Sequence, residues 1–186
     1  TMPTNPEQRV TIAGLGAIGR SIAQRLDNGI PGWRLAAVAS RDAAKAQAFL
    51  STLKYPVPLV PMTALAAEAD IVIECAPARL LAEIAQPVLQ AGKRLIVLSA
   101  GALLDNPQLE KLAESHATQI MVPSGALIGL DALTAAAEGH IESVRLVTRK
   151  PVAGLLGAPY LVQNNIDIAG IQAPLRLFAG SAREAA

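Results

Sequence analysis

The stretch of sequence that decides the fold is VTIAGLGAIG, at residues 10–19. It joins a short apolar run to three glycines with the spacing G-x-G-x-x-G, at Gly14, Gly16 and Gly19. Behind the glycines, apolar residues recur at helical spacing as far as Asn28-Gly29. A strand that ends in this glycine pattern and continues into a helix predicts the phosphate-binding turn of a dinucleotide-binding fold.

Each part of this turn has its own expected role. Gly14 allows the tight turn, Gly16 lets the backbone approach a pyrophosphate, and Gly19 permits close contact between helix and strand. The first helical turn, with Ala17 and Ile18, supplies free N–H donors and the positive end of the helix dipole. The alternative is a glycine-rich turn with no ligand, which the agreement of strand, glycines and helix disfavours.

Short apolar runs alternate with helix-period segments from this point to about Gly139. Helical crossovers between most of the runs predict parallel neighbours, so the fold class is α/β, with a doubly wound parallel sheet of the Rossmann type. Residues 1–139 are the predicted dinucleotide-binding domain. The six predicted strands are 10–13, 35–39, 57–60 (a short edge strand between prolines), 71–75, 95–98 and 119–122.

After Gly139 the pattern changes. Ile141–Arg149 alternates between apolar and polar residues, which predicts a half-exposed strand, and Ala173–Phe178 is a second strand-like run. Residues 181–185 are typical of the first turn of a helix. We therefore expect residues 140–186 to be the beginning of a second, α+β substrate or dimerisation domain, which is incomplete in this sequence.

Composition and charge exclude several classes of protein. The chain has 16 basic and 15 acidic residues, a formal net charge of +1, and 52% hydrophobic residues, so it is neither disordered nor a nucleic-acid coat. A single cysteine, Cys75, excludes an intramolecular disulfide and a thiolate metal cluster, and it fits a reducing compartment. Without a signal-peptide core in residues 1–9 or an apolar run of ~20 residues, we expect a soluble cytoplasmic protein with no membrane or nucleic-acid partner and no metal.

The end of the second predicted strand bears on the choice of cofactor. An acidic residue there would bind the ribose 2′-OH of NAD and repel a 2′-phosphate. Ser40 and Arg41 instead offer a hydroxyl and a guanidinium, which suit the phosphate of NADP. Asp42 is better explained as the cap of the next helix. The sequence favours NADP and leaves NAD open.

Two further strand ends are candidates for contact with the nicotinamide ribose, because ligands bind outside the carboxyl ends of parallel strands. The candidate residues, through their backbone groups, are Cys75, Ala76, Pro77, Ser99 and Gly101. The thiol of Cys75 is a poor candidate for a nucleophile, since nothing beside it in sequence would lower its pKa. His116 and His140 have no ligand-spaced partner and are interpreted as solvated residues.

Several blocks of sequence occur in the order seen in L-aspartate dehydrogenases, which the chain resembles over essentially its whole length. The resemblance implies NAD(P)-dependent oxidative deamination of L-aspartate through iminoaspartate to oxaloacetate and ammonia, a link to NAD biosynthesis, and a homodimer with a Rossmann domain and a substrate domain. It also places Ala126 at a position that contacts the cofactor. The blocks are residues 14–19, Glu74-Cys75-Ala76, residues 99–103, Pro123-Ser124-Gly125-Ala126 with residues 129–133, Thr148-Arg149-Lys150-Pro151, and residues 178–186.

The resemblance places the family's catalytic histidine after the last of these blocks. We therefore assign no catalytic residue within the chain and expect this chain to be catalytically incomplete. Two alternatives remain open from the sequence. One is another two-domain Rossmann oxidoreductase, of the glucose-fructose oxidoreductase or dihydrodipicolinate reductase kind. The other is a non-enzymatic dinucleotide sensor, which the lack of a basic helix-turn-helix region disfavours.

Overall fold

The computed structural model describes residues 7–125 and 127–185, which form two compact units. Residues 7–125 contain all the strands of the described chain, and residues 127–185 contain short helices joined by extended segments. The division between the units comes earlier than the predicted domain boundary after Gly139, which stays a prediction.

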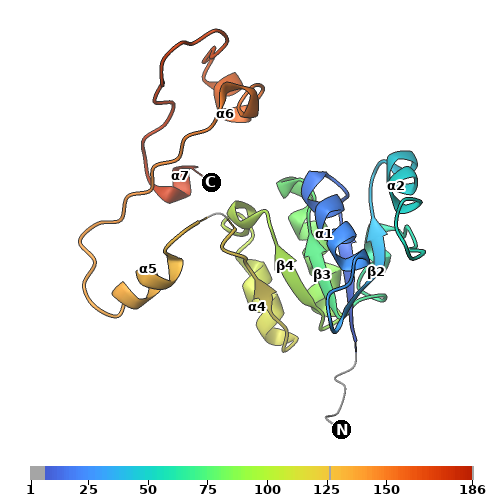
Figure 1. Cartoon of the computed structure of the whole chain (residues 1–186). Helices are drawn as coiled ribbons and strands as arrows, with labels where there is room; N and C mark the ends of the chain where they lie inside the picture. Colours follow the sequence, from blue (N-terminus) through green and yellow to red (C-terminus); the bar gives the residue numbers. More distant parts are fainter. Residues whose placement is uncertain (1–6, 126, 186) are drawn as a thin grey trace. The chain divides into compact units, whose positions relative to one another are not determined.

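The first unit is built on a five-stranded sheet in which every neighbouring pair of strands is parallel (Figure 1). The chain passes from β1 to the edge strand β2, then returns across β1 to β3 and continues outward. The predicted doubly wound Rossmann sheet is confirmed. Its order is β2-β1-β3-β4-β5, with β1 at Gln8–Ala13, β2 at Trp33–Ala39, β3 at Ile71–Glu74, β4 at Arg94–Val97 and β5 at Ile120–Met121.

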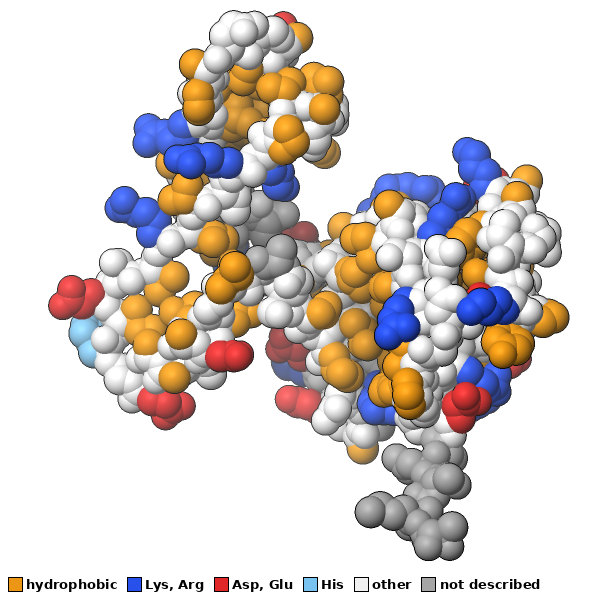
Figure 2. Space-filling model, viewed as in Figure 1, with side chains coloured by type: hydrophobic (Ala, Val, Ile, Leu, Met, Phe, Trp, Pro, Cys, Tyr) orange, Lys and Arg blue, Asp and Glu red, His pale blue; other side chains and the backbone are white. Residues whose placement is uncertain are grey.

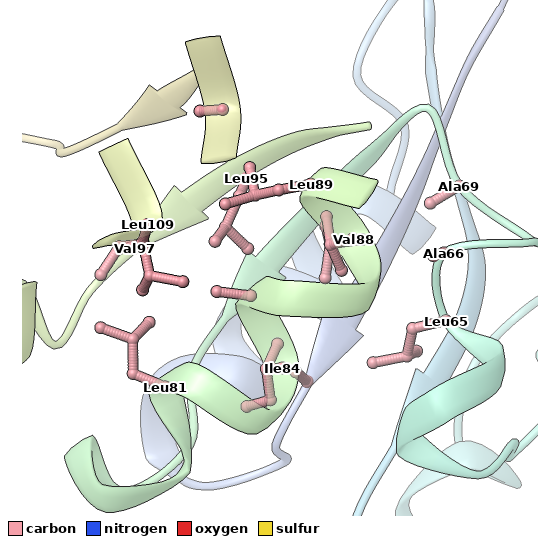
Figure 3. Close-up of a cluster of buried hydrophobic side chains, with 14 of the residues drawn as sticks. Leu65, Ala66, Ala69, Leu81, Ile84, Val88, Leu89, Leu95, Val97 and Leu109 are labelled. Carbon is pink, nitrogen blue, oxygen red and sulfur yellow. The ribbon is translucent and has the colours of Figure 1, made fainter. Parts of the chain in front are cut away.

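Helices cover both faces of this sheet. On one face α1 (Ala17–Asp27) and α2 (Ala43–Leu50) pack against Val10, Ile12 and Val38. On the other face α3 (Leu81–Gln90) and α4 (Gln108–Ser115) pack, with the segment around Leu65, against alternate residues of the same strands. Figure 3 shows this second cluster, in which leucines and valines of α3 and α4 meet Leu95 and Val97 of β4. Apolar residues on both faces of the strands explain why the central strands are continuous apolar runs.

One predicted edge strand is wrong. Residues 57–60 form only an isolated parallel bridge, between Leu59 and Val38 of β2. The two hydrogen bonds of this bridge run from Val38 N–H to the Pro58 carbonyl and from Val60 N–H to the Val38 carbonyl. Pro58 itself has no N–H to donate, and prolines at 56 and 61 flank the segment, so the ladder extends no further.

The second unit contains the predicted helical turn at 181–185, but neither of its predicted strands. Its helices are α5 (Leu130–Ala136), the single 3-10 turn η4 (Val152–Gly154), α6 (Pro159–Gln163) and α7 (Ala182–Ala185). No strand occurs at Ile141–Arg149 or Ala173–Phe178. An alternating sequence forms a stable strand only when a neighbour pairs its backbone, and among residues 127–185 no such pairing occurs.

Apolar side chains of this unit consequently lie on the surface (Figure 2). Val144 and Leu146, on the apolar side of the predicted alternation, are 61% and 67% exposed, and Val147, on the other side, is 71% exposed. The buried hydrophobic residues of the unit are Leu161 and Ile168. Across the described ranges 7–125 and 127–185, no helix is long and apolar enough to cross a membrane.

Candidate functional site

The glycine loop connects the end of β1 to the start of α1, as the sequence predicts. Gly14 has a φ of 103°, in the left-handed region that favours glycine, and its N–H donates to the Ala39 carbonyl of β2 at 2.8 Å. A Cβ on Gly19 would lie 2.1 Å from the Gly14 carbonyl oxygen, closer than atoms can approach. The roles expected for Gly14 in the turn and for Gly19 in close packing are therefore both visible in the backbone.

Gly16 has different surroundings. It is exposed, it is the N-cap of α1, and no described atom lies within 4 Å of the position that a Cβ would take. No side chain caps the N–H groups of the first turn, and no acidic residue lies in that turn. The exposed Ala17 and Ile18 follow directly. An uncapped helix N-terminus beside open space fits a phosphate group, because the free N–H donors and the helix dipole both favour an anion.

Ser40 and Arg41 follow β2, the strand next to β1. Ser40 is half-buried and Arg41 is exposed, and among the described residues nothing hydrogen-bonds or pairs with the Arg41 guanidinium. Asp42 caps α2 as predicted, accepting from the Lys45 N–H at 3.0 Å. This bond, and the Lys45 ammonium at 3.1 Å, hold the pKa of Asp42 below its ordinary value. Because Asp42 is engaged with its own helix, Arg41 is the charged group left at this strand end.

The residues after β3 and β4 are held together by a residue that the sequence analysis did not assign to the site. Glu74, the last residue of β3, is fully buried. Its Oε1 accepts from the Ala76 N–H at 2.8 Å. Its Oε2 accepts from the N–H of Leu98 at 3.2 Å and from the N–H and Oγ–H of Ser99 at 2.9 and 2.6 Å. A lone carboxylate in an apolar strand was the available signal, because buried charges are nearly always paired.

Cys75 is a packing residue under the glycine loop. Its N–H donates to the Ala13 carbonyl at 2.8 Å, and its Cβ lies 3.4 Å from the position that a Cβ of Gly19 would take. Burial, together with the charge of Glu74, raises the pKa of the Cys75 thiol to about 12. The thiol is therefore protonated at neutral pH, which argues against a nucleophilic role.

The remaining predicted residues divide by position. Ala76, Pro77, Ser99 and Gly101 follow β3 and β4, so they share the carboxyl edge of the sheet with the glycine loop and Ser40-Arg41. Ala126 lies outside the described residues.

His116 does not lie with this group, and His140 belongs to residues 127–185, the second unit. His116 and His140 are exposed, and His116 caps the end of α4, which leads to the opposite edge of the sheet.

Arg20, also missed from the sequence, steadies the glycine loop. Its Nε donates to the Leu15 carbonyl at 3.0 Å, and its guanidinium lies 5.4 Å from the centre of the Phe49 ring of α2.

A separate apolar groove of about 420 Å³, lined by residues such as Ile22, Ile73 and Ile96, contains none of the predicted cofactor residues. In residues 7–125 and 127–185, no three His, Cys, Asp or Glu side chains are grouped to hold a metal ion.

Comparison with family models divides the chain in two. Residues 14–123 match a model described as the NAD-binding domain of homoserine dehydrogenase, and residues 131–186 match one described as the C-terminal part of aspartate dehydrogenase.

Individual relatives match along the whole chain. L-aspartate dehydrogenase 3 of Bordetella bronchiseptica is 54% identical over 186 residues, covering all of this chain and 68% of that protein. An L-aspartate dehydrogenase of Bradyrhizobium diazoefficiens is 54% identical over 180 residues, covering 97% of this chain and 64% of that protein. The chain thus spans about two thirds of the length of these relatives.

Solved structures with lower identity show the same fold. Biliverdin reductase from Synechocystis sp. PCC 6803, crystallised with biliverdin and NADP+, superimposes with a TM-score of 0.58 at 24% identity, covering 71% of this chain and 42% of that one. UDP-N-acetylglucosamine 3-dehydrogenase from Acidithiobacillus ferrooxidans superimposes with a TM-score of 0.58 at 21% identity, covering 71% of this chain and 44% of that one.

Proposed function

The chain belongs to the L-aspartate dehydrogenase family, and we propose that it serves the NAD(P)-dependent oxidative deamination of L-aspartate. In this reaction the α-carbon of L-aspartate loses a hydride to the nicotinamide, and water hydrolyses the resulting iminoaspartate to oxaloacetate and ammonia. The observation that carries the proposal is the 54% identity to an L-aspartate dehydrogenase over all 186 residues.

The carboxyl edge of the sheet supports the cofactor part of the proposal. The match of residues 14–123 to an NAD-binding family model supports NAD or NADP as the cofactor. In our proposal the glycine loop and the first turn of α1 hold the pyrophosphate, since this turn has no side-chain cap and Gly16 faces open space. Residues 75–77 and 99–101 line the nicotinamide ribose, together with Ala126. The cofactor supplies the hydride acceptor, and the protein supplies orientation and electrostatics.

The cofactor preference is the finer part of the proposal. Arg41 is an exposed cation beside the half-buried Ser40, and a guanidinium pairs well with a phosphate. We therefore favour NADP over NAD.

A homodimer, a cytoplasmic location and a role in NAD biosynthesis are further proposals. All three rest on the family resemblance, and the single cysteine suits a reducing compartment.

The direct test uses the full-length gene product. It is incubated with L-aspartate and either NAD+ or NADP+, and absorbance at 340 nm and released ammonia are both measured. We expect reduced cofactor and ammonia in equal amounts with L-aspartate, and neither with D-aspartate or L-glutamate as matched controls. Cofactor binding without turnover of L-aspartate, or faster turnover of another amino acid, would show that the substrate is wrong while the dinucleotide site is right.

A further inference from the structure

Glu74 is the feature of the carboxyl edge that the proposed reaction leaves unexplained. It ends a strand whose other residues, Ile71, Val72 and Ile73, are apolar, and its carboxylate is completely removed from solvent. Strands β1, β2 and β4 end on Ala13, Ala39 and Val97, all buried apolar residues. A buried carboxylate needs several hydrogen-bond donors to offset its lost hydration, so the identity of those donors indicates what it holds.

The four donors of Glu74 come from two different loops. One carboxylate oxygen accepts from Ala76, in the loop after β3. The other accepts from the backbone of Leu98 and Ser99 and from the Ser99 hydroxyl, in the loop after β4. Hydrogen bonds to an ionised acceptor are about twice as strong as neutral ones. A single side chain therefore sets the separation of the two loops proposed to line the nicotinamide ribose.

The same arrangement reaches the glycine loop. A Cβ on Gly14 would lie 2.6 Å from the Cys75 carbonyl oxygen and 3.1 Å from the Ala76 Cα. Gly14 therefore packs directly on the backbone that Glu74 fixes through Ala76. The bond from the Cys75 N–H to the Ala13 carbonyl holds this contact independently of Glu74, so loss of the carboxylate should shift the loop after β4 and leave the glycine loop in place.

We propose that Glu74 is a positioning residue for the nicotinamide half of the cofactor. Its carboxylate fixes residues 75–77 and 98–101 relative to each other, so that this half of the dinucleotide meets a preformed surface. The proposed function assigns the pyrophosphate to the first turn of α1 and the adenosine half to Ser40-Arg41, and Glu74 bonds to none of these residues. The inference rests on the dinucleotide site of the proposed function and adds a residue that acts on only part of the ligand.

The test separates the two halves of the cofactor. Glu74→Gln keeps the size of the side chain but replaces one acceptor oxygen with an amide group, leaving at least one loop N–H without its acceptor. Dissociation constants of the full-length gene product are measured by calorimetry for NADP+ and for 2′-phospho-ADP-ribose, which lacks the nicotinamide. We expect the constant for NADP+ to rise about tenfold or more, and the constant for 2′-phospho-ADP-ribose to change by less than about twofold.

The matched control lies at the other end of the same strand. Asp70 directly precedes β3 and bonds to Arg9, so Asp70→Asn removes a carboxylate near the sheet without touching either loop. It should leave both dissociation constants unchanged.

Ser99→Ala serves as a milder variant in case Glu74→Gln does not fold, because it removes one of the four bonds. It should weaken NADP+ binding a few-fold and 2′-phospho-ADP-ribose binding not at all. In the double variant it should add little to Glu74→Gln, as expected when one residue acts through the other.

The outcomes distinguish this inference from the proposed function. If Glu74→Gln lowers the affinity for both ligands equally, or for neither, the positioning role is overturned. The dinucleotide site of the proposed function stands in either case. Full additivity of Ser99→Ala and Glu74→Gln also overturns it. A wild-type protein that binds neither ligand overturns the dinucleotide site itself, and this inference with it.

Discussion

Strand β3 has a carboxylate at each end, and the two have opposite surroundings. Asp70, before the strand, is about one third exposed and accepts from the guanidinium of Arg9 at 2.9 Å and from its backbone N–H at 2.8 Å. Arg94 donates to Gln8 at the same edge of the sheet. Glu74, at the other end, is fully buried and bonds chiefly to backbone N–H groups of loops.

The difference distinguishes the two edges of the sheet. At the amino edge, charged side chains pair across neighbouring strands within reach of water, where such pairs contribute little to stability. At the carboxyl edge, the carboxylate of Glu74 is buried beneath the loops, and the uncapped start of α1 faces open space. Changes at the carboxyl edge should therefore alter ligand binding, and changes at the amino edge should alter stability alone.

The largest effect is expected from Gly19→Ala. The added Cβ would lie 2.1 Å from the Gly14 carbonyl oxygen, a backbone atom that cannot turn aside. Helix α1 must move away from β1, which should cost about 1–3 kcal/mol of stability as overpacking and at least about tenfold in dinucleotide affinity. Thermal unfolding and calorimetry measure the two effects. Gly139→Ala, whose Cβ would have its nearest neighbour at 3.6 Å, is the control.

Gly16→Val should separate binding from folding. Gly16 has a φ of −72°, which any residue adopts, and its Cβ would enter open space. We expect stability to change by no more than about 0.5 kcal/mol, while affinity for NADP and NAD falls about tenfold or more because the side chain blocks the approach of the pyrophosphate. If the variant keeps its circular dichroism spectrum and binds both cofactors as tightly as the wild type, the glycine loop is not the binding site.

Much of the fold was predictable because the strands of a doubly wound sheet are buried on both faces. Residues 10–13 and 71–75 appear as apolar runs whatever their neighbours are. Ile141–Arg149 shows the limit of this reasoning. Its alternation describes one strand, but a strand also requires a partner that the pattern does not name.

The candidate site was also predictable in part, where its residues follow directly from a strand end or a local motif. The spacing of the three glycines is enough to predict the geometry of their turn. The position of Ser40-Arg41 at the carboxyl edge follows from the predicted end of the second strand. Glu74 was visible as a charge in an apolar strand, yet its partners Leu98 and Ser99 are 24 and 25 residues away in sequence. No local pattern links them, so its role required the structure.

Arg41→Ala should affect one cofactor and not the other. A contact between guanidinium and phosphate is charge-assisted, so its loss should weaken NADP binding about tenfold and leave NAD binding nearly unchanged. The ratio of the two dissociation constants is the measurement. Lys54→Ala, which removes an exposed cation outside the predicted site, is the control. Equal losses for NADP and NAD in Arg41→Ala would show that Arg41 does not contact the 2′-phosphate.

The smallest effect is expected at the amino edge, from Asp70→Asn. Hydrogen bonds from Arg9 lower the pKa of Asp70 from 3.8 to about 2, and the bonds from the Arg9 side chain have a larger effect than the bond from its backbone N–H. A carboxyl whose pKa is lower in the folded state stabilises the protein above its unfolded pKa, and this contribution disappears as the pH falls through the folded value. The variant should therefore melt roughly 1–4 °C below the wild type at pH 7. This gap, the difference in melting temperature between the wild type and the variant, should narrow below about pH 4 and close near pH 2.

Thermal melts of the two proteins at pH 7, 5, 3 and 2 measure this gap, with Glu114→Gln, an exposed carboxylate of α4, as the control. Cofactor affinity at pH 7 should be the same in the variant and the wild type, because Asp70 and the glycine loop lie at opposite ends of the strands. A gap that persists unchanged to pH 2 would mean that the charge of Asp70 is not what stabilises this edge. A loss of cofactor affinity would mean that the two edges of the sheet are not independent, and the contrast between Asp70 and Glu74 would then fail.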